Sequence, residues 1–73
     1  MAELKYEITK TIGALSEANK GWIKELNLVS WNDRDPKYDI RDWSAEHDKM
    51  TKGITLSHDE LVELKKLLNS LDI

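Results

Sequence analysis

The sequence contains no cysteine and no phenylalanine, and it has only three glycines and one proline. Without cysteine, neither disulfides nor a cysteine-based zinc site can stabilise it. A chain of 73 residues buries only about 60% of its unfolded surface when it folds. Oligomerisation is the usual remaining source of stability at this size, so we expect one domain over residues 1–73 that dimerises.

The sequence also lacks a hydrophobic run near the roughly 18 residues that a membrane span requires, and its first ten residues are too charged for a signal peptide. Together with the absence of cysteine, this predicts a soluble cytoplasmic protein. The net charge is −3, of which the segment from Ser57 onward contributes −2. Nucleic-acid-binding domains are usually basic, so any basic surface must be a local stripe.

Aromatic and cationic residues alternate in the middle of the chain. The residues concerned are Trp22, Lys24, Trp31, Lys37, Arg41 and Trp43. A surface that stacks unpaired bases needs flat rings together with cations, because every base has a π-face and every linkage a phosphate. The segment from Lys24 to Trp43 is therefore where we expect the function.

The first predicted strand begins with the alternation of Leu4, Tyr6 and Ile8 with polar residues, and it runs to Leu15. Gly13 interrupts this strand and indicates a bulge or bend. Residues 16–21 have turn composition.

The second predicted strand is Trp22–Trp31, and its residues fall into two alternating sets. We assign one set to the interior because it holds two leucines: Lys24, Leu26, Leu28 and Ser30. We expect the other set to face outward: Ile23, Glu25, Asn27, Val29 and Trp31.

Residues 32–36 form a polar hairpin turn ending in Pro36, and the third predicted strand is Lys37–Trp43. Tyr38 and Ile40 of this strand are expected in the core. The predicted open face carries Trp31, Arg41 and Trp43.

A polar segment of mobile composition, residues 44–52, precedes a fourth predicted strand, Gly53–Leu56. Ser57 and Glu60 have the spacing of a capping box, which predicts a helix start. Leucines then follow at helical spacing, and we expect them to pack on the sheet and against a partner's helix. The predicted dimer contacts are Leu61, Leu64, Leu68 and Leu71. The fold class is thus α+β, an antiparallel four-stranded sheet followed by one helix.

Each candidate site residue also has a structural interpretation. Trp31 and Trp43 are candidates for stacking, or else tryptophans of a core or dimer interface, whereas for Trp22 we favour core packing. Arg41 is either a ligand contact or an ion-pair partner within the sheet. Lys52, next to a glycine, is the more constrained lysine of its loop.

No catalytic or metal-binding pattern is found. The acidic residues Asp33, Asp35 and Asp39 suggest a calcium loop, but such a loop needs Gly at its sixth and Glu at its twelfth position. Those positions are Tyr38 and Ser44. The two histidines, His47 and His58, lack a second ligand at metal spacing. We therefore predict a protein that is not an enzyme and has no metal or cofactor.

Two motifs resemble a known family, namely DIRDW at residues 39–43 and KGITL at residues 52–56. In their order and spacing, and with the helix start that follows, the chain resembles the transcriptional positive cofactor 4 family from about Tyr6 to Leu68, in particular its short bacterial YdbC-like members. The resemblance implies a homodimer of curved antiparallel sheets, with the helices packed across the two-fold axis. Single-stranded DNA would lie along the concave surface.

By position in these motifs, Trp31 matches the family's stacking aromatic, Arg41 its phosphate-contacting arginine and Lys52 the lysine before the glycine turn. Trp43 lies near a second stacking position and Lys37 near the basic hairpin. Asp33 and Asp35 depart from the lysines of the eukaryotic members.

We therefore predict sequence-tolerant binding of single-stranded DNA in transcription regulation, replication or repair. The predicted nucleic-acid contacts are Trp31, Trp43, Arg41, Lys37, Lys52, Lys24 and Asn27. Two alternatives use the same face: a module that binds a protein of the transcription or repair machinery, and a binder of single-stranded RNA.

Overall fold

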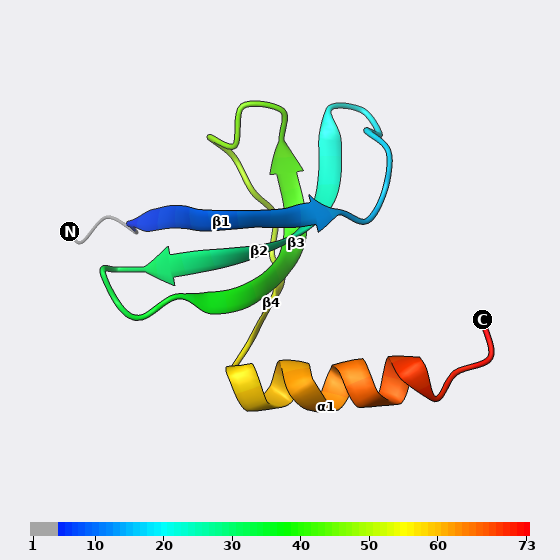
Figure 1. The fold of residues 1–73 in the computed structure, drawn as a ribbon. Coiled ribbons are helices and arrows are strands. Elements are labelled where there is room, and N and C mark those ends of the chain that lie inside the picture. The colour runs from blue at the N-terminus through cyan, green and yellow to red at the C-terminus, as the bar shows by residue number, and fades with distance from the viewer. Residues whose placement is uncertain (1–4) are drawn as a thin grey trace.

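The computed structural model describes residues 5–73 and contains one sheet and one helix (Figure 1). The strands are β1 (Tyr6–Ala14), β2 (Trp22–Trp31), β3 (Lys37–Ser44) and β4 (Ile54–Leu56), and they are antiparallel neighbours in the order of the sequence. The helix α1 (His58–Asn69) follows. This confirms the predicted α+β class and every predicted element, although Leu4 of the first expected strand lies outside the described residues.

The pairing of β1 with β2 contains two irregularities. The register shifts between Ile8 and Lys10 and again between Thr11 and Gly13, where the sequence predicts a bulge or bend. A bulge bends its strand and increases the local twist. The sheet is accordingly curved, and the upper ends of β2 and β3 turn away from α1 (Figure 1).

Both predicted hairpin turns are confirmed, at residues 16–21 and at the end of β2. In the second turn Asn32 and Asp33 have φ angles of 52° and 63°, and the Arg34 N–H donates to the Trp31 carbonyl at 3.0 Å. Positive φ at both central residues defines the type I′ turn, which asparagine and aspartate tolerate. This turn places Trp31 at the rim of the sheet.

The sheet has an outer face, against which α1 packs, and an inner face on the opposite side. The register places the following residues on the inner face: Tyr6, Ile23, Glu25, Asn27, Val29, Trp31, Asp39, Arg41 and Trp43. The prediction that this set of β2 residues faces solvent is therefore wrong, because Glu25, Asn27 and Val29 are buried, with exposed fractions of 7%, 0% and 0%. Leu26 and Leu28, expected in the interior, are half-buried on the outer face.

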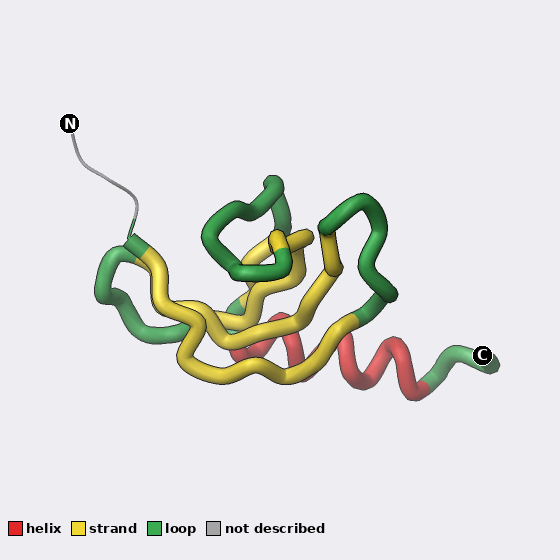
Figure 2. The backbone as a smooth tube through the Cα atoms, turned by 90° about the horizontal axis from the view of Figure 1, so that it is seen from above, coloured by secondary structure: helices red, strands yellow, loops and turns green. Residues whose placement is uncertain are grey.

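The connection from β3 to β4 explains this difference. It folds back over the inner face instead of extending into solvent (Figure 2). The Ser44 hydroxyl donates to Asp48 at 2.8 Å, the Ser44 N–H donates to the Lys49 carbonyl at 3.0 Å, and the Thr51 N–H donates to the Asp42 carbonyl at 3.1 Å. The mobile segment expected at residues 44–52 is thus a hydrogen-bonded cover for the inner face.

The helix begins as predicted. The Glu60 N–H donates to the Ser57 hydroxyl at 3.1 Å, and the Ser57 N–H donates to the Glu60 carboxylate at 2.8 Å, which completes a capping box. No residue of α1 is buried, and Leu67, Leu68 and Leu71 remain 62%, 49% and 54% exposed. The described chain therefore leaves much of its leucine stripe open to solvent.

Candidate nucleic-acid interface

Trp31 lies at the rim of the inner face and is half-buried. The Arg41 guanidinium carbon sits 4.6 Å from the centroid of its ring, which is a cation–π contact. The Tyr6 ring lies 6.0 Å away at a tilt of 47°. A base can therefore reach only the part of the indole that these two side chains leave exposed.

Arg41 is held mainly by Asp39, two residues earlier in β3. Arg41 Nε and Nη2 donate to the two carboxylate oxygens of Asp39 at 2.6 and 2.7 Å. Nη1 makes longer contacts, at 3.4 Å, with the Met50 sulfur and the Thr51 carbonyl. With its side chain only 13% exposed, Arg41 takes the ion-pair alternative that the sequence left open, and its predicted phosphate contact would have to compete with a bidentate carboxylate.

A second polar group lies beside this pair. His47 Nε2 is 2.9 Å from both carboxylate oxygens of Glu25, and the Tyr6 hydroxyl donates to the His47 carbonyl at 2.6 Å. The Asn27 amide donates to Glu25 at 2.9 Å. Asn27, predicted to contact nucleic acid, is 0% exposed, so its side chain is not accessible to a ligand in this structure.

Trp43 is also buried, with an exposure of 0%. Its ring packs 5.3 Å from Tyr6 and 5.7 Å from His47, measured between centroids. The predicted face of Trp43 is correct, but the prediction that its ring is exposed is wrong, because Tyr6 and the loop carrying His47 close over it. Strand parity assigns a face and cannot indicate what covers that face.

The predicted lysines divide between the two faces. Lys24 lies on the outer face, and its ammonium is 3.1 Å from the Asp42 carboxylate, away from Trp31. Lys37 is exposed at the start of β3, opposite Val29 on the inner face. Lys52 is exposed in the loop that crosses Arg41, and among residues 5–73 neither Lys37 nor Lys52 has an ion-pair partner.

The remaining tryptophan, Trp22, was expected in the core and is instead half-buried. It lines a shallow outer hollow beside Lys20 and Lys24, at the first hairpin turn. This hollow also contains Glu17 and Asp42, so it is not a basic site.

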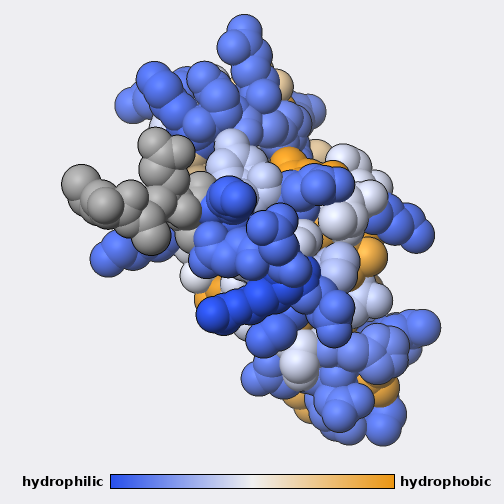
Figure 3. Space-filling model, turned by 90° about the vertical axis from the view of Figure 1, so that its left-hand side faces the viewer, coloured by the Kyte–Doolittle hydropathy of each residue, from blue (hydrophilic) through white to orange (hydrophobic). Residues whose placement is uncertain are grey.

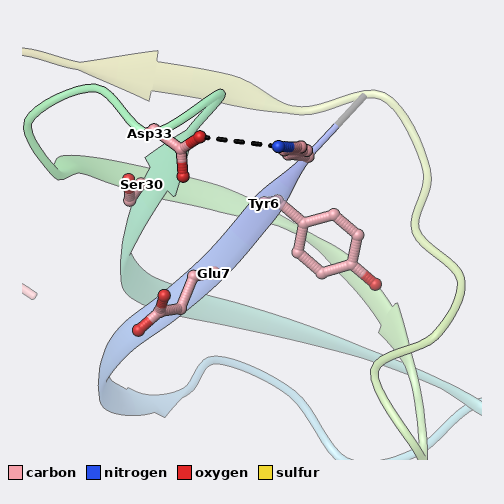
Figure 4. Close-up of a pocket in the computed structure, with 5 residues that line it drawn as sticks. Tyr6, Glu7, Ser30 and Asp33 are labelled. Carbon is pink, nitrogen blue, oxygen red and sulfur yellow. Dashed lines mark ion pairs between the residues drawn. The ribbon is translucent and has the colours of Figure 1, made fainter. Parts of the chain in front are cut away.

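A pocket of about 350 Å³ lies where β1 meets the end of β2 (Figure 4). Tyr6 and Glu7 leave β1 on opposite sides, and Lys5 pairs with Asp33 at 3.8 Å. With Glu7 and Asp33 both in its wall, this pocket does not attract phosphate. The surrounding end of the molecule is mostly hydrophilic, with small apolar patches (Figure 3).

Sequence patterns indicate few of the residues that organise the inner face. Asp39 has a usable signal, because it stands two positions before Arg41 and so shares its face of β3. Glu25 likewise has the parity of Trp31. His47 and Tyr6 have none, since only the folding of the loop brings them together.

Within residues 5–73, no three acidic, histidine or cysteine side chains form a group that could hold a metal ion. None of the helices in these residues has the length and apolar character needed to cross a membrane.

The fold and the site together define a small binding domain, in which a curved antiparallel sheet presents a tryptophan–arginine pair on the face opposite its helix. Residues 18–67 match the family model of Transcriptional Coactivator p15 (PC4). The chain is also 48% identical over 71 residues to an uncharacterized protein of Treponema pallidum (strain Nichols), an alignment that covers 97% of this chain and 84% of that protein. The chain belongs to the PC4 family, whose domain is known for binding single-stranded DNA and for coactivation and is not enzymatic.

Proposed function

We propose that this protein binds single-stranded DNA with little sequence preference through the inner-face rim around Trp31. The observation that carries the proposal is the half-buried indole held against Arg41 at the rim of the sheet. An aromatic ring in this setting offers a stacking surface to any unpaired base, and one stacked base contributes about 1–3 kcal/mol.

Lys37 and Lys52 are the cations best placed to meet the phosphates, because both are exposed and flank the Trp31–Arg41 pair along the sheet and its covering loop. The centre of the inner face contributes no net positive charge, since Arg41 is opposed by the carboxylates of Asp39 and Glu25. Binding should therefore depend more on stacking than on charge, with a shallow dependence on salt.

We further propose that the protein acts as a homodimer joined through its outer face. A groove of about 440 Å³ runs between α1 and the sheet, and apolar side chains dominate its lining: Leu26, Tyr38, Leu61, Val62, Leu64 and Leu68. The radius of gyration is 13.3 Å, against about 11 Å for a compact domain of this length. A second copy seated on α1 would cover the leucine stripe and double the number of Trp31 rings available to one strand of DNA.

The process served is proposed at the level of the family: transcription regulation of a coactivator-like kind, or replication and repair. The similarity to a protein of a bacterium is consistent with a bacterial cytoplasmic protein that associates with the nucleoid. Single strands arise in all of these processes, and a stacking surface does not distinguish among them.

The test is a binding titration of labelled oligothymidine with purified protein at two salt concentrations, in which the fluorescence anisotropy of the oligonucleotide reports binding. We expect binding by single strands, weak binding by duplex, and a loss on the order of tenfold or more for Trp31→Ala, the equivalent of about 1–3 kcal/mol. Trp22→Ala is the matched control, because it removes an equally large ring from the outer face.

Equal affinity for duplex and single strands would sink the stacking mechanism, since paired bases do not offer their faces. Tighter binding of oligouridine than of oligothymidine would move the proposal to RNA. No binding of any oligonucleotide would favour a protein partner at this face.

A further inference from the structure

The carboxylate of Asp39 organises the Trp31–Arg41 pair from beneath. Asp39 is 0% exposed, and both of its oxygens accept hydrogen bonds from Arg41. The Thr55 hydroxyl donates to the same carboxylate at 3.1 Å, from β4. The buried carboxylate thus accepts two hydrogen bonds from the Arg41 cation and one from the neutral Thr55 hydroxyl. These bonds fix its position, and the bidentate pair sets the plane of the guanidinium.

The loop before β4 closes on Arg41 from another side. A Cβ atom at Gly53 would lie 2.3 Å from Arg41 Cβ and 2.3 Å from the Ile40 carbonyl oxygen, so only glycine allows the backbone to run this close. Just before it, the Thr51 carbonyl and the Met50 sulfur approach Arg41 Nη1 at 3.4 Å. Arg41 is thereby held by Asp39 of its own strand, by Trp31 of β2 and by this loop.

These contacts leave Arg41 poorly suited to hold a phosphate. Its charge is compensated at 2.6 Å, its side chain is 13% exposed, and one side of the guanidinium faces the Trp31 ring at 4.6 Å. A phosphate that took Nε and Nη2 would displace the buried Asp39 and leave its carboxylate with only the Thr55 hydroxyl, which is strongly unfavourable. The remaining nitrogen, Nη1, already faces the Met50 sulfur and the Thr51 carbonyl.

We infer that Arg41 is a positioning residue for Trp31 rather than a phosphate contact, and that Asp39 holds it in place. The pair presets the orientation in which the indole meets an unpaired base. This inference rests on the proposed function, in which a base stacked on Trp31 is the ligand, and it assigns the phosphate contacts to lysines outside the pair.

The first experiment needs no ligand. Trp31 Nε1 is buried and has no hydrogen-bond partner within residues 5–73, so burial alone protects its proton. We expect Arg41→Gln and Asp39→Asn each to accelerate exchange of the Trp31 indole proton, measured by NMR, while exchange at Trp43 Nε1 stays unchanged. Unchanged exchange at Trp31 in both variants would overturn the inference.

The second experiment uses the sign of the effect on oligothymidine binding. If Arg41 contacted a phosphate, Asp39→Asn would free its guanidinium, tighten binding and steepen the salt dependence. If Arg41 positions Trp31, Asp39→Asn and Arg41→Gln both weaken binding, on the order of tenfold, and leave the slope of log affinity against log salt unchanged.

Lys37→Gln is the matched control, because it removes one exposed cation that the inference assigns to phosphate binding. Its slope should become shallower by about 0.7, the value for one neutralised phosphate on a single strand. If the salt dependence of binding became shallower in Arg41→Gln by as much as in Lys37→Gln, the inference would be contradicted.

A milder variant covers the case in which a substitution prevents folding, and the exchange measurement covers the case in which no oligonucleotide binds. Should Asp39→Asn fail to fold, Thr55→Val removes only the neutral donor to Asp39, and it should weaken binding in the same direction by a smaller factor. If the wild-type protein binds no oligonucleotide, the proposed function fails, whereas the indole exchange rates still decide whether Arg41 and Asp39 position Trp31.

Discussion

The two faces of the sheet reach burial by opposite means. On the inner face the chain closes over itself, so that Trp43, Asn27 and Asp39 are 0% exposed although two of them are polar. On the outer face the side chains are more hydrophobic, yet α1 contains no buried residue. Burial in this protein therefore does not follow hydrophobicity. The short loop between β3 and β4 is enough to cover the inner face, whereas α1 alone is too small to cover the outer face.

This difference has a functional consequence. Hydrogen bonds connect the centre of the inner face, whereas Trp31 at its rim is only half-buried. The outer face offers a broad apolar area suited to a second copy. In the proposed function, the rim of the inner face meets DNA and the outer face meets a second copy.

The largest expected effect comes from breaking the closed inner face. Trp43→Ala removes a ring that is 0% exposed, and we expect it to lower the free energy of unfolding by about 3–5 kcal/mol, through lost burial and a cavity. Trp22→Ala, which truncates a half-buried ring, should cost about 1 kcal/mol. Urea denaturation followed by circular dichroism measures both, and equal losses would show that the inner face is not the core.

The outer face is tested by association rather than by unfolding. Leu68→Gln places an amide in the leucine stripe of α1, at a position that is 49% exposed. If a second copy covers this position, desolvating the amide costs about 1–3 kcal/mol, and the dimer should dissociate at about 10- to 100-fold higher concentration in sedimentation equilibrium.

A second groove lies between α1 and β4, beside Ile54 and Leu56. Lys66→Gln introduces the same amide at a position of α1 that lines neither this groove nor the one that contains Leu68, and it should leave the dimer intact. Identical behaviour of Leu68→Gln and Lys66→Gln would argue against the outer face as the dimer interface.

The smallest expected effect lies at the start of α1, where the capping box does not depend on the packing of either face of the sheet. The Ser57 backbone N–H, followed by its hydroxyl contact, lowers the pKa of Glu60 from its ordinary value of 4.5. A lowered pKa in the folded state gives stability that is present above the unfolded value and lost as the pH falls through the folded value.

Glu60→Gln keeps a capping oxygen but removes the charge. Wild type should therefore be more stable than the variant at neutral pH, and the gap should close as the pH falls from the ordinary pKa of 4.5 through the lowered pKa of the folded state. Thermal unfolding across this range provides the measurement. A gap that stays constant with pH would show that the charge of Glu60 does not contribute.

Much of the fold could be predicted from local signals. Alternation in Tyr6–Ala14 and Lys37–Ser44, the polar turns at residues 16–21 and 32–36, and the Ser57 capping box each act within a few residues, so they needed no knowledge of the rest of the chain. The candidate site was predicted less well. Trp31 lies at the rim as expected, whereas Trp43 and Asn27 are buried and Lys24 is paired on the other face.

The sequence by itself determined which residues share a face, because side chains of a strand alternate whatever surrounds them. Only the tertiary structure decided which face would be closed. That outcome depends on contacts between residues far apart in the chain, such as the Tyr6 hydroxyl on the His47 carbonyl and the His47 ring on Glu25. Gly53 gives the same lesson, since its need for close approach to Arg41 exists only once the loop has folded back.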